Sequence, residues 1–202
     1  AGYSEKVAIS EASWLPELDN ETSIWGQPWM FILRDVLQFS NNLEEGATNL
    51  FNANRTYKLY LGIASPVENQ FRGFEFIQTS LKMYTDKNWS HPFSDIHPQF
   101  DGIMYWDKSG HQDDPCPGEV FKGNYGEITP EVLYQQVCGY DKTGDTMVVV
   151  YDWPHNQFFV SWSSSVDGTE AYKRPLFRMN MTHWFNLPIN STDATYELDY
   201  EL

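Results

Sequence analysis

The chain has 202 residues, of which 41% are hydrophobic and 16% aromatic, enough for one domain with a substantial hydrophobic core. Its formal net charge of −15 disfavours nucleic acid and anionic lipid surfaces as partners, because phosphate groups would be repelled over most of the surface. The longest apolar runs, WMFIL (29–33) and MVVVY (147–151), are too short to cross a bilayer, so we expect no membrane span.

The first quarter of the chain predicts one strand followed by two helices. Residues 6–12 alternate in the manner of a strand, and residues 13–27 are typical of a loop. Pro28 can begin a helix over 28–40, and Asn42 can cap a second helix over 42–54. The apolar stripes expected to face the core are Phe31, Ile32, Val36 and Phe39 in the first helix, and Leu43, Ala47, Leu50 and Phe51 in the second.

Strands dominate the rest of the sequence. Residues 56–65 and 71–85 flank a turn and predict a hairpin, and residues 86–128 are rich in loops with a short strand at 102–107. We expect a helix over 129–139, capped by Thr129 and ended by Gly139. Two core strands follow at 145–153 and 156–164, where Trp153 and Trp162 are expected to pack inside. The sum is an α+β fold with mainly antiparallel sheets and helices layered on them.

Five glycosylation acceptor motifs and two cysteines indicate the secretory route. The pattern Asn-X-Ser/Thr occurs more often than chance would give, and none of the five has Pro in the middle. Cys116 and Cys138 could close a disulfide, which fits the same oxidising compartment. We therefore expect an extracellular, cell-surface or lysosomal glycoprotein, with sugars at Asn20, Asn54, Asn88, Asn180 and Asn190.

No attacking group can be identified in the sequence by its motif. Cys116 lies between two prolines, a setting that suits a disulfide better than an activated thiolate. His91 and His97, with Asp95 between them, could be imagined as metal ligands, but a polar turn explains them more simply. We expect no metal and no cofactor.

The order of several segments nevertheless resembles a known family, the N-terminal-nucleophile amide hydrolases. The similar branch is that of acyl-coenzyme A:6-aminopenicillanic acid acyltransferase and the acid-ceramidase-like proteins. The resemblance covers the chain to about residue 185, leaving 186–202 as an acidic tail. It is carried by GYSEKVAISEA, GQPWMFILRDVLQFSNNLEEGATNLFNANRTYKLYLGIAS, FRGFEF, HPQFDGIMYWDK, YGEITPEVL, KTGDTMVVVYD and AYKRPLFRMNM.

The resemblance implies an αββα sandwich, of which residues 1–185 would be the C-terminal part. Enzymes of this family cut their own precursor before a Cys, and the freed N-terminal Cys attacks the amide. Segments similar to GYSEKVAISEA come well after that Cys in the family, so the nucleophile is expected on an upstream chain of the same precursor.

Three residues are pocket candidates through the resemblance alone. Tyr60 aligns with the region where acyltransferase relatives often have an Asn that helps hold the oxyanion. Arg72 and Arg174 match positions characteristic of the branch, where an arginine could recognise a carboxylate or polar head, or could simply tie strands and loops together.

Three functions are left open by the sequence. The first is a subunit of a secreted or lysosomal N-acyl amide hydrolase, acting by thiol acylation and hydrolysis. The second is an inactive glycoprotein that uses the same fold as a structural or self-assembling component. The third is a carbohydrate-binding module, because eight Trp residues could supply stacking platforms for sugars.

Overall fold

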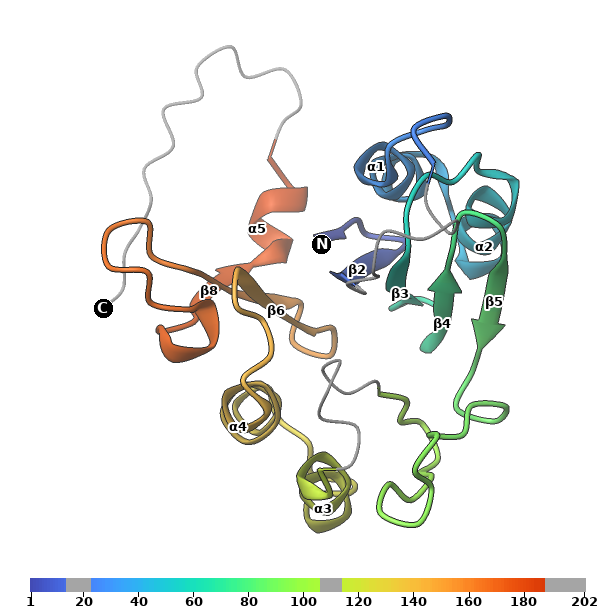
Figure 1. Cartoon of the computed structure of the whole chain (residues 1–202). Coiled ribbons are helices and arrows are strands. Elements are labelled where there is room, and N and C mark those ends of the chain that lie inside the picture. The colour runs from blue at the N-terminus through green and yellow to red at the C-terminus, as the bar shows by residue number, and fades with distance from the viewer. Residues whose placement is uncertain (14–22, 106–113, 188–202) are drawn as a thin grey trace.

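The structure is a computed structural model that describes residues 1–13, 23–105 and 114–187. It has a mixed α+β fold in which the strand pairings of these residues are antiparallel (Figure 1). This confirms the predicted class and the antiparallel character of the sheets. Within the same residues, no helix combines the length and the apolar character that a membrane crossing requires.

The first sheet has five strands in chain order. They are β1 (Gly2–Tyr3), β2 (Ala8–Ser13), β3 (Leu59–Ser65), β4 (Gln70–Phe76) and β5 (Leu81–Tyr84). The predicted hairpin is present as β3 and β4, which pair from Leu59 with Phe76 to Ser65 with Gln70. The prediction of one continuous strand over 71–85 is wrong. A turn between Ile77 and Ser80 divides this segment and pairs β5 with β4.

Two helices cover one face of this sheet, α1 (Trp29–Phe39) and α2 (Leu43–Asn52). Both predicted starts are confirmed: Pro28 precedes α1, and the Asn42 side chain accepts a hydrogen bond from the Glu45 amide at 2.8 Å. The helices bury their apolar stripes against alternate residues of the strands. The buried core is Val7, Ile9, Ile32, Leu33, Val36, Leu43, Ala47, Leu50, Leu59, Leu61, Ile63, Phe74 and Phe76.

The predicted stripes are wrong at three phenylalanines, Phe31, Phe39 and Phe51, which are 45%, 61% and 49% exposed. Leu33 takes the place predicted for Phe31, because each helical step turns by about 100° and Leu33 falls on the side of Val36. The Phe51 ring meets the ring of Phe74 on β4 edge to face, with their centroids 6.5 Å apart.

The loop-rich segment after β5 contains a helix that the sequence prediction missed. It is α3 (Cys116–Gly123), and it packs closely on residues 96–98. The short strand predicted at 102–107 is not formed by its described residues, which contribute only an isolated bridge between Phe100 and Ile103.

The helix predicted over 129–139 exists but differs at its end. Thr129 accepts a hydrogen bond from the Val132 amide, as expected of a cap. The chain then forms a π-helix, η1 (Val132–Cys138), and continues as α4 (Gly139–Asp141). Gly139 therefore does not end the helix. Lys142 ends it by adopting a left-handed conformation with φ of 50°.

A second sheet has three strands in chain order. They are β6 (Met147–Asp152), β7 (Gln157–Trp162) and β8 (Phe177–Asn180), with the 3₁₀-helix η2 (Ala171–Lys173) before β8 and α5 (Met181–Phe185) after it. The two predicted core strands are β6 and β7. The expectation for Trp162 is wrong, because its side chain is 53% exposed.

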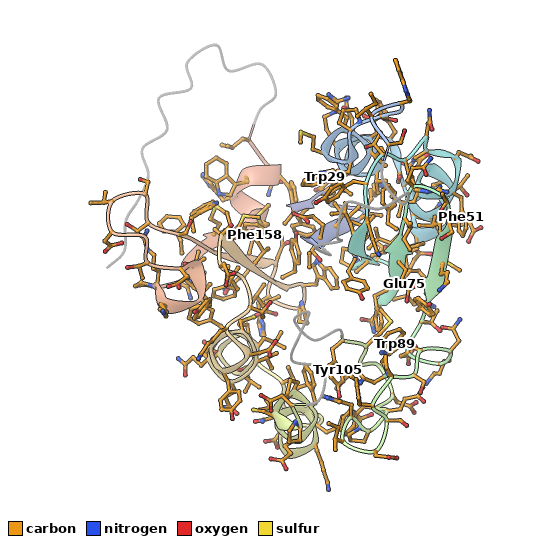
Figure 2. The ribbon with its side chains drawn as sticks, viewed as in Figure 1. Trp29, Phe51, Glu75, Trp89, Tyr105 and Phe158 are labelled. Carbon is orange, nitrogen blue, oxygen red and sulfur yellow. The ribbon has the colours of Figure 1, made fainter. Side chains whose placement is uncertain are left out.

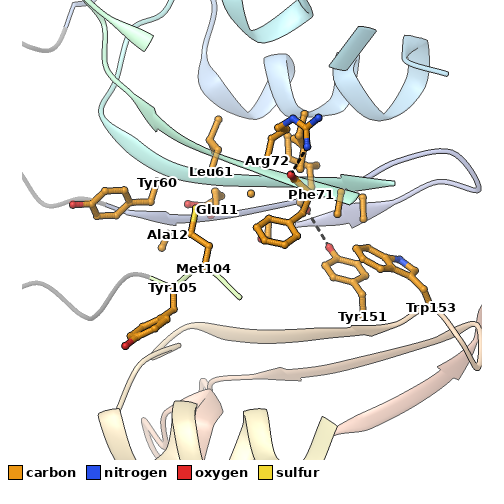
Figure 3. Close-up of a pocket in the computed structure, with 16 residues that line it drawn as sticks. Glu11, Ala12, Tyr60, Leu61, Phe71, Arg72, Met104, Tyr105, Tyr151 and Trp153 are labelled. Atoms are coloured by element: carbon orange, nitrogen blue, oxygen red, sulfur yellow. Dashed lines mark hydrogen bonds between the residues drawn. The ribbon is translucent and has the colours of Figure 1, made fainter. Parts of the chain in front are cut away.

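The two sheets face each other and carry helices on their outer sides (Figures 1 and 3). Residues of η1 and η2 pack on Val148 and Val150 of β6 and close the outer core of the second sheet. Figure 2 shows side chains filling the helix-covered sides of both sheets. The acidic tail predicted at 186–202 falls almost entirely outside the described residues, so the boundary at residue 185 stays a prediction.

Candidate functional site

A cavity of about 380 Å³ lies between the two sheets (Figure 3). Its roof is the face of the five-stranded sheet that α1 and α2 do not cover, and Tyr151 of β6 rises into it from the opposite sheet. The lining includes Ala8, Ser10, Glu11, Ala12, Tyr60, Gly62, Ala64, Phe71, Arg72, Met104, Tyr105, Tyr151 and Trp153.

The alternation of the strands explains why there is space here. On β3, Leu59, Leu61 and Ile63 are at most 1% exposed and belong to the core under the helices. The residues between them therefore point to the opposite side, towards the second sheet. Some of these residues are small: Gly62 lines the cavity and pairs with Ser10 of β2, which also lines it, and with Gly73 of β4. Small side chains on three neighbouring strands leave a hollow between the sheets.

Tyr151 bridges the two sheets beside the cavity. Its hydroxyl lies 3.0 Å from the carbonyl oxygen of Ile9 on β2 and 3.0 Å from that of Gly2 on β1, and donates to these acceptors. Burial raises the pKa of this phenol, so it keeps its proton and remains a donor. The sequence prediction treated this residue only as part of a buried strand.

Tyr60 belongs to a polar group at one end of the cavity roof. It pairs across the hairpin with Glu75, which in turn pairs with Lys82 on β5. The Glu75 carboxylate accepts hydrogen bonds from the Lys82 ammonium at 2.9 Å and from the Tyr84 hydroxyl at 3.1 Å. Burial, and then the nearby Glu75 carboxylate, raises the pKa of Tyr60 to about 12. The Tyr60 phenol therefore keeps its proton and can donate a hydrogen bond.

Glu11 on β2 borders the cavity, but it pairs with Leu61, so its side chain belongs to the helix-covered side of the sheet. Its Oε2 atom is buried and accepts no hydrogen bond from the described residues. Desolvation raises the pKa of Glu11 above that of an ordinary glutamate. Without this carboxylate, the cavity combines an apolar lining with a small number of polar groups from Ser10, Tyr60 and Tyr151, the composition that small-molecule sites usually have.

Two of the three pocket candidates line this cavity, and the third does not. Tyr60 and Arg72 contribute to the lining. The Arg72 guanidinium donates hydrogen bonds within its own strand, to the Phe71 carbonyl at 2.8 Å and to Gln70 Oε1 at 3.1 Å. Figure 3 shows it on the other side of the strand from the Phe71 ring. Arg174 follows η2 on the second sheet, where its carbonyl lies near Ser161, and it is not among the lining residues.

Tyr105, Met104 and Glu75 are, like Tyr151, among the residues that sequence reasoning did not assign to the site. Glu75 could have been found, because counting outward from the turn of the hairpin places it opposite Tyr60. Tyr105 carried no such signal, because the loop that brings it to the cavity has no regular periodicity.

His91 and His97, which were considered as metal ligands, belong to a buried aromatic cluster. His91 and His97 are 7% and 1% exposed, and their ring centroids are 3.9 Å apart. His97 Nδ1 lies 3.0 Å from the Tyr105 hydroxyl, which connects the cluster to the cavity wall. Asp95 is exposed, and the described residues contain no group of three or more His, Cys, Asp or Glu that could hold a metal ion.

Neither cysteine belongs to the cavity. Cys116 begins α3 and Cys138 ends η1, and both thiols are free in this structure. Desolvation raises the pKa of Cys116 and brings that of Cys138 to about 11, which disfavours either thiol as a nucleophile. The disulfide between them stays a prediction.

Three of the predicted glycosylation sites can be located. Asn54, Asn88 and Asn180 are exposed, as a glycosylated side chain requires, while Asn20 and Asn190 lie outside the described residues. The Asn88 and Asn180 side chains also accept backbone hydrogen bonds in a turn and at the start of α5. Attachment of sugars at these positions stays a prediction.

Comparison with known proteins gives relatives but no family. No model of a known protein family matches the sequence. The chain is similar to Protein dcd1B of Dictyostelium discoideum, with 30% identity over 203 residues that cover 92% of this chain and 40% of that protein. It is also similar to Protein dcd1A of the same organism, with 28% identity over 204 residues covering 92% of this chain and 44% of that protein. The chain thus spans less than half the length of the curated relatives it matches.

Proposed function

We propose that this chain forms part of a secretory N-acyl amide hydrolase of the N-terminal-nucleophile type. In this proposal the cavity between the sheets receives the acyl amide, and a Cys at the start of an upstream chain of the same precursor attacks its carbonyl carbon. The thiol is acylated, the amine leaves, and water then releases the acid.

The observation that carries the proposal is the cavity between two facing antiparallel sheets with helices on their outer sides. An αββα sandwich with its site between the layers is what the resemblance to this hydrolase family implies. The lining of Ala, Phe, Met and Tyr side chains would accommodate an apolar acyl group. Contact between the acyl group and these side chains removes apolar surface from water, which is favourable.

Tyr60 is the proposed donor to the oxyanion that forms during attack. Its phenol is protonated at neutral pH, and Glu75, Lys82 and Tyr84 surround its position on the roof. An oriented neutral donor in a partly buried site stabilises a developing negative charge more than it stabilises the uncharged amide. Tyr60 would thus do the work that an Asn does in the acyltransferase relatives.

The nucleophile is tested by identifying every chain that purifies with this one. Intact mass and N-terminal sequencing, before and after treatment with iodoacetamide, should reveal a partner whose first residue is a labelled Cys. Loss of hydrolysis of N-acyl amides should accompany the labelling. A preparation that hydrolyses these amides with no N-terminal Cys on any of its chains would contradict the proposal.

The role of Tyr60 is tested by Tyr60→Phe, which removes only the hydroxyl. We expect kcat to fall by roughly 100-fold with little change in KM, because the lost hydrogen bond forms in the transition state. Tyr125→Phe is the matched control: Tyr125 is exposed, and its hydroxyl bonds to the Asp101 carbonyl away from the cavity. Equal activity of both variants and the wild-type protein would remove Tyr60 from the mechanism.

A second candidate is a glycoprotein that keeps this fold without catalysis. It is supported by the described lining of the cavity, which contains neither a Cys nor a His, and by the Tyr in place of the oxyanion-holding Asn. Light scattering that shows defined self-assembly, together with no thiol reactivity in any chain of the preparation, would favour this function over the hydrolase.

A further inference from the structure

A second cavity, of about 310 Å³, lies where the chain segments at one end of the two sheets meet. It shares Trp153 with the first cavity. Its walls come from the start of the chain, the turn after β3, the turn after β6 and helix α5. The lining residues are Tyr3, Glu5, Pro66, Val67, Trp153, Asn156 and Phe185.

Aromatic rings from three separate segments form most of this wall. The Tyr3 and Phe185 rings meet edge to face, with their centroids 5.3 Å apart and their planes at 68°. The Trp153 ring is nearly parallel to that of Tyr151, at 6.0 Å and 17°, and the Tyr3 ring meets Tyr151 edge to face at 5.9 Å. Tyr151, which is not itself in this lining, thus contacts two of the three wall rings.

Hydrogen bonds orient the polar part of the wall. The Tyr3 hydroxyl donates to Asn156 Oδ1 at 3.2 Å, and Asn156 Nδ2 donates to the Thr182 hydroxyl at 2.5 Å. Each polar atom of the Asn156 amide therefore already makes one hydrogen bond within the wall. These two bonds fix the orientation of the Tyr3 ring and of the Asn156 side chain in the wall.

The charge of the wall is negative. Glu5 is exposed at the cavity, and its lining contains no Lys, Arg or His. Glu5 lies close enough to Tyr3 to raise the pKa of that phenol, in addition to the effect of burial. Aromatic faces and a carboxylate attract the same kind of ligand, because both present negative charge to it.

We propose that Tyr3, Trp153 and Phe185 form an aromatic cage, with Glu5 at its side, that binds a small quaternary ammonium group such as that of choline. Methyl groups on a cation spread its charge over an apolar surface, which favours contact with aromatic faces over contact with water. This site is separate from the proposed hydrolase chemistry and does not depend on it.

The test compares choline with its uncharged isostere 3,3-dimethylbutan-1-ol, which has the same shape with carbon in place of nitrogen. Each compound is titrated into the ¹⁵N-labelled protein while the indole N–H resonance of Trp153 is followed, after assignment with Trp153→Phe. We expect saturable binding of choline, tighter than that of the alcohol by about fivefold or more.

Two variants measure how much the Glu5 charge and the Phe185 ring contribute to choline binding. Glu5→Gln should weaken choline about fivefold and leave the alcohol unchanged, because only the cation interacts with the carboxylate. Phe185→Leu keeps apolar bulk but removes a ring, and should also weaken choline. Glu127→Gln, an exposed glutamate away from this cavity, is the control and should have no effect.

Three outcomes would overturn the proposal. Absence of saturable choline binding, with Trp153 well resolved and the protein folded, would show that the rings are only packing. Equal affinity for choline and the alcohol would show an apolar pocket that does not recognise charge. Binding of methyl glucoside at the same resonance in preference to choline would assign the site to sugars.

Discussion

Two buried histidines, His91 and His97, are expected to make the stability of the fold depend on pH. The His91 ring lies against the His97 ring, and His91 Nδ1 accepts a hydrogen bond from the Phe93 amide at 3.1 Å, which requires that nitrogen to carry no proton. Burial, and then the neighbouring His97, lowers the pKa of His91 to about 4 from its ordinary value of 6.5. The folded protein therefore resists taking up a proton that the unfolded chain accepts.

The free energy of unfolding should fall as the pH decreases from about 6.5 to 4, because only the unfolded chain gains the proton in that window. For a shift of this size the loss is up to about 3 kcal/mol. His91→Asn should remove this part of the dependence, because its amide oxygen can still accept the Phe93 hydrogen bond and does not titrate. Urea unfolding at pH 7 and pH 4.5 measures the difference.

His155→Asn is the matched control for this prediction. His155 is exposed, with 72% of its side chain accessible, and its ring lies beside the Asp152 carboxylate, with Nδ1 2.8 Å from Oδ2. Its replacement should leave the loss of stability below pH 6.5 as large as in the wild-type protein. A wild-type protein that is equally stable at both pH values would contradict the burial of the histidine pair.

At the scale of elements, the contact between α3 and residues 96–98 depends on a single glycine. A Cβ atom at Gly118 would lie 2.5 Å from the Ile96 carbonyl oxygen and 3.3 Å from the His97 Cα, both of which are backbone atoms. Gly118→Ala must therefore separate α3 from this segment or distort one of them. We expect the free energy of unfolding to drop by about 1–3 kcal/mol in urea titrations.

Gly123→Ala tests whether the position or the substitution matters. Gly123 is the last residue of the same helix, and a Cβ atom there meets nothing within 4 Å. This variant should be as stable as the wild-type protein or slightly more stable, because Ala favours helix. If both variants were equally stable, the close approach of α3 to Ile96 would be wrong.

The elements that local sequence predicts well are those with strong caps and clear periodicity. Pro28 and Asn42 mark the starts of α1 and α2, and the turn after Ser65 marks the hairpin, because each signal depends on neighbouring residues only. Helix α3 was not predicted, because Pro117 and two glycines are typical of a loop. Tertiary contacts rather than helix propensity stabilise it.

At the scale of the molecule, the site depends on contacts between residues that are far apart in the sequence, and local sequence patterns do not predict such contacts. Tyr60 and Arg72 were placed by resemblance, and both line the cavity, whereas Arg174 matched the same resemblance and lies elsewhere. Tyr151 approaches Ile9 across 142 residues of chain, and only the facing of the two sheets brings them together. The small residues that open the cavity could be read from the hairpin, but their role requires knowing which face the helices leave uncovered.

The net charge of −15 has a consequence for the whole molecule, because self-repulsion among its acidic groups destabilises the compact state. We expect the free energy of unfolding to rise by about 1 kcal/mol when NaCl is raised from about 10 mM to 500 mM at pH 7, because the screening length falls below the spacing of surface charges. KCl should act equally, since screening depends on ionic strength and not on the identity of the cation.

A charge variant separates this screening from other effects of salt. Asp95 and Glu127 are exposed and have no ion pair in the part of the chain that the structure describes. Asp95→Lys combined with Glu127→Lys lowers the repulsion without removing a contact, so the variant should gain less stability from NaCl than the wild-type protein does. An equal gain in both proteins would mean that salt acts through hydrophobic burial, because that effect is independent of net charge.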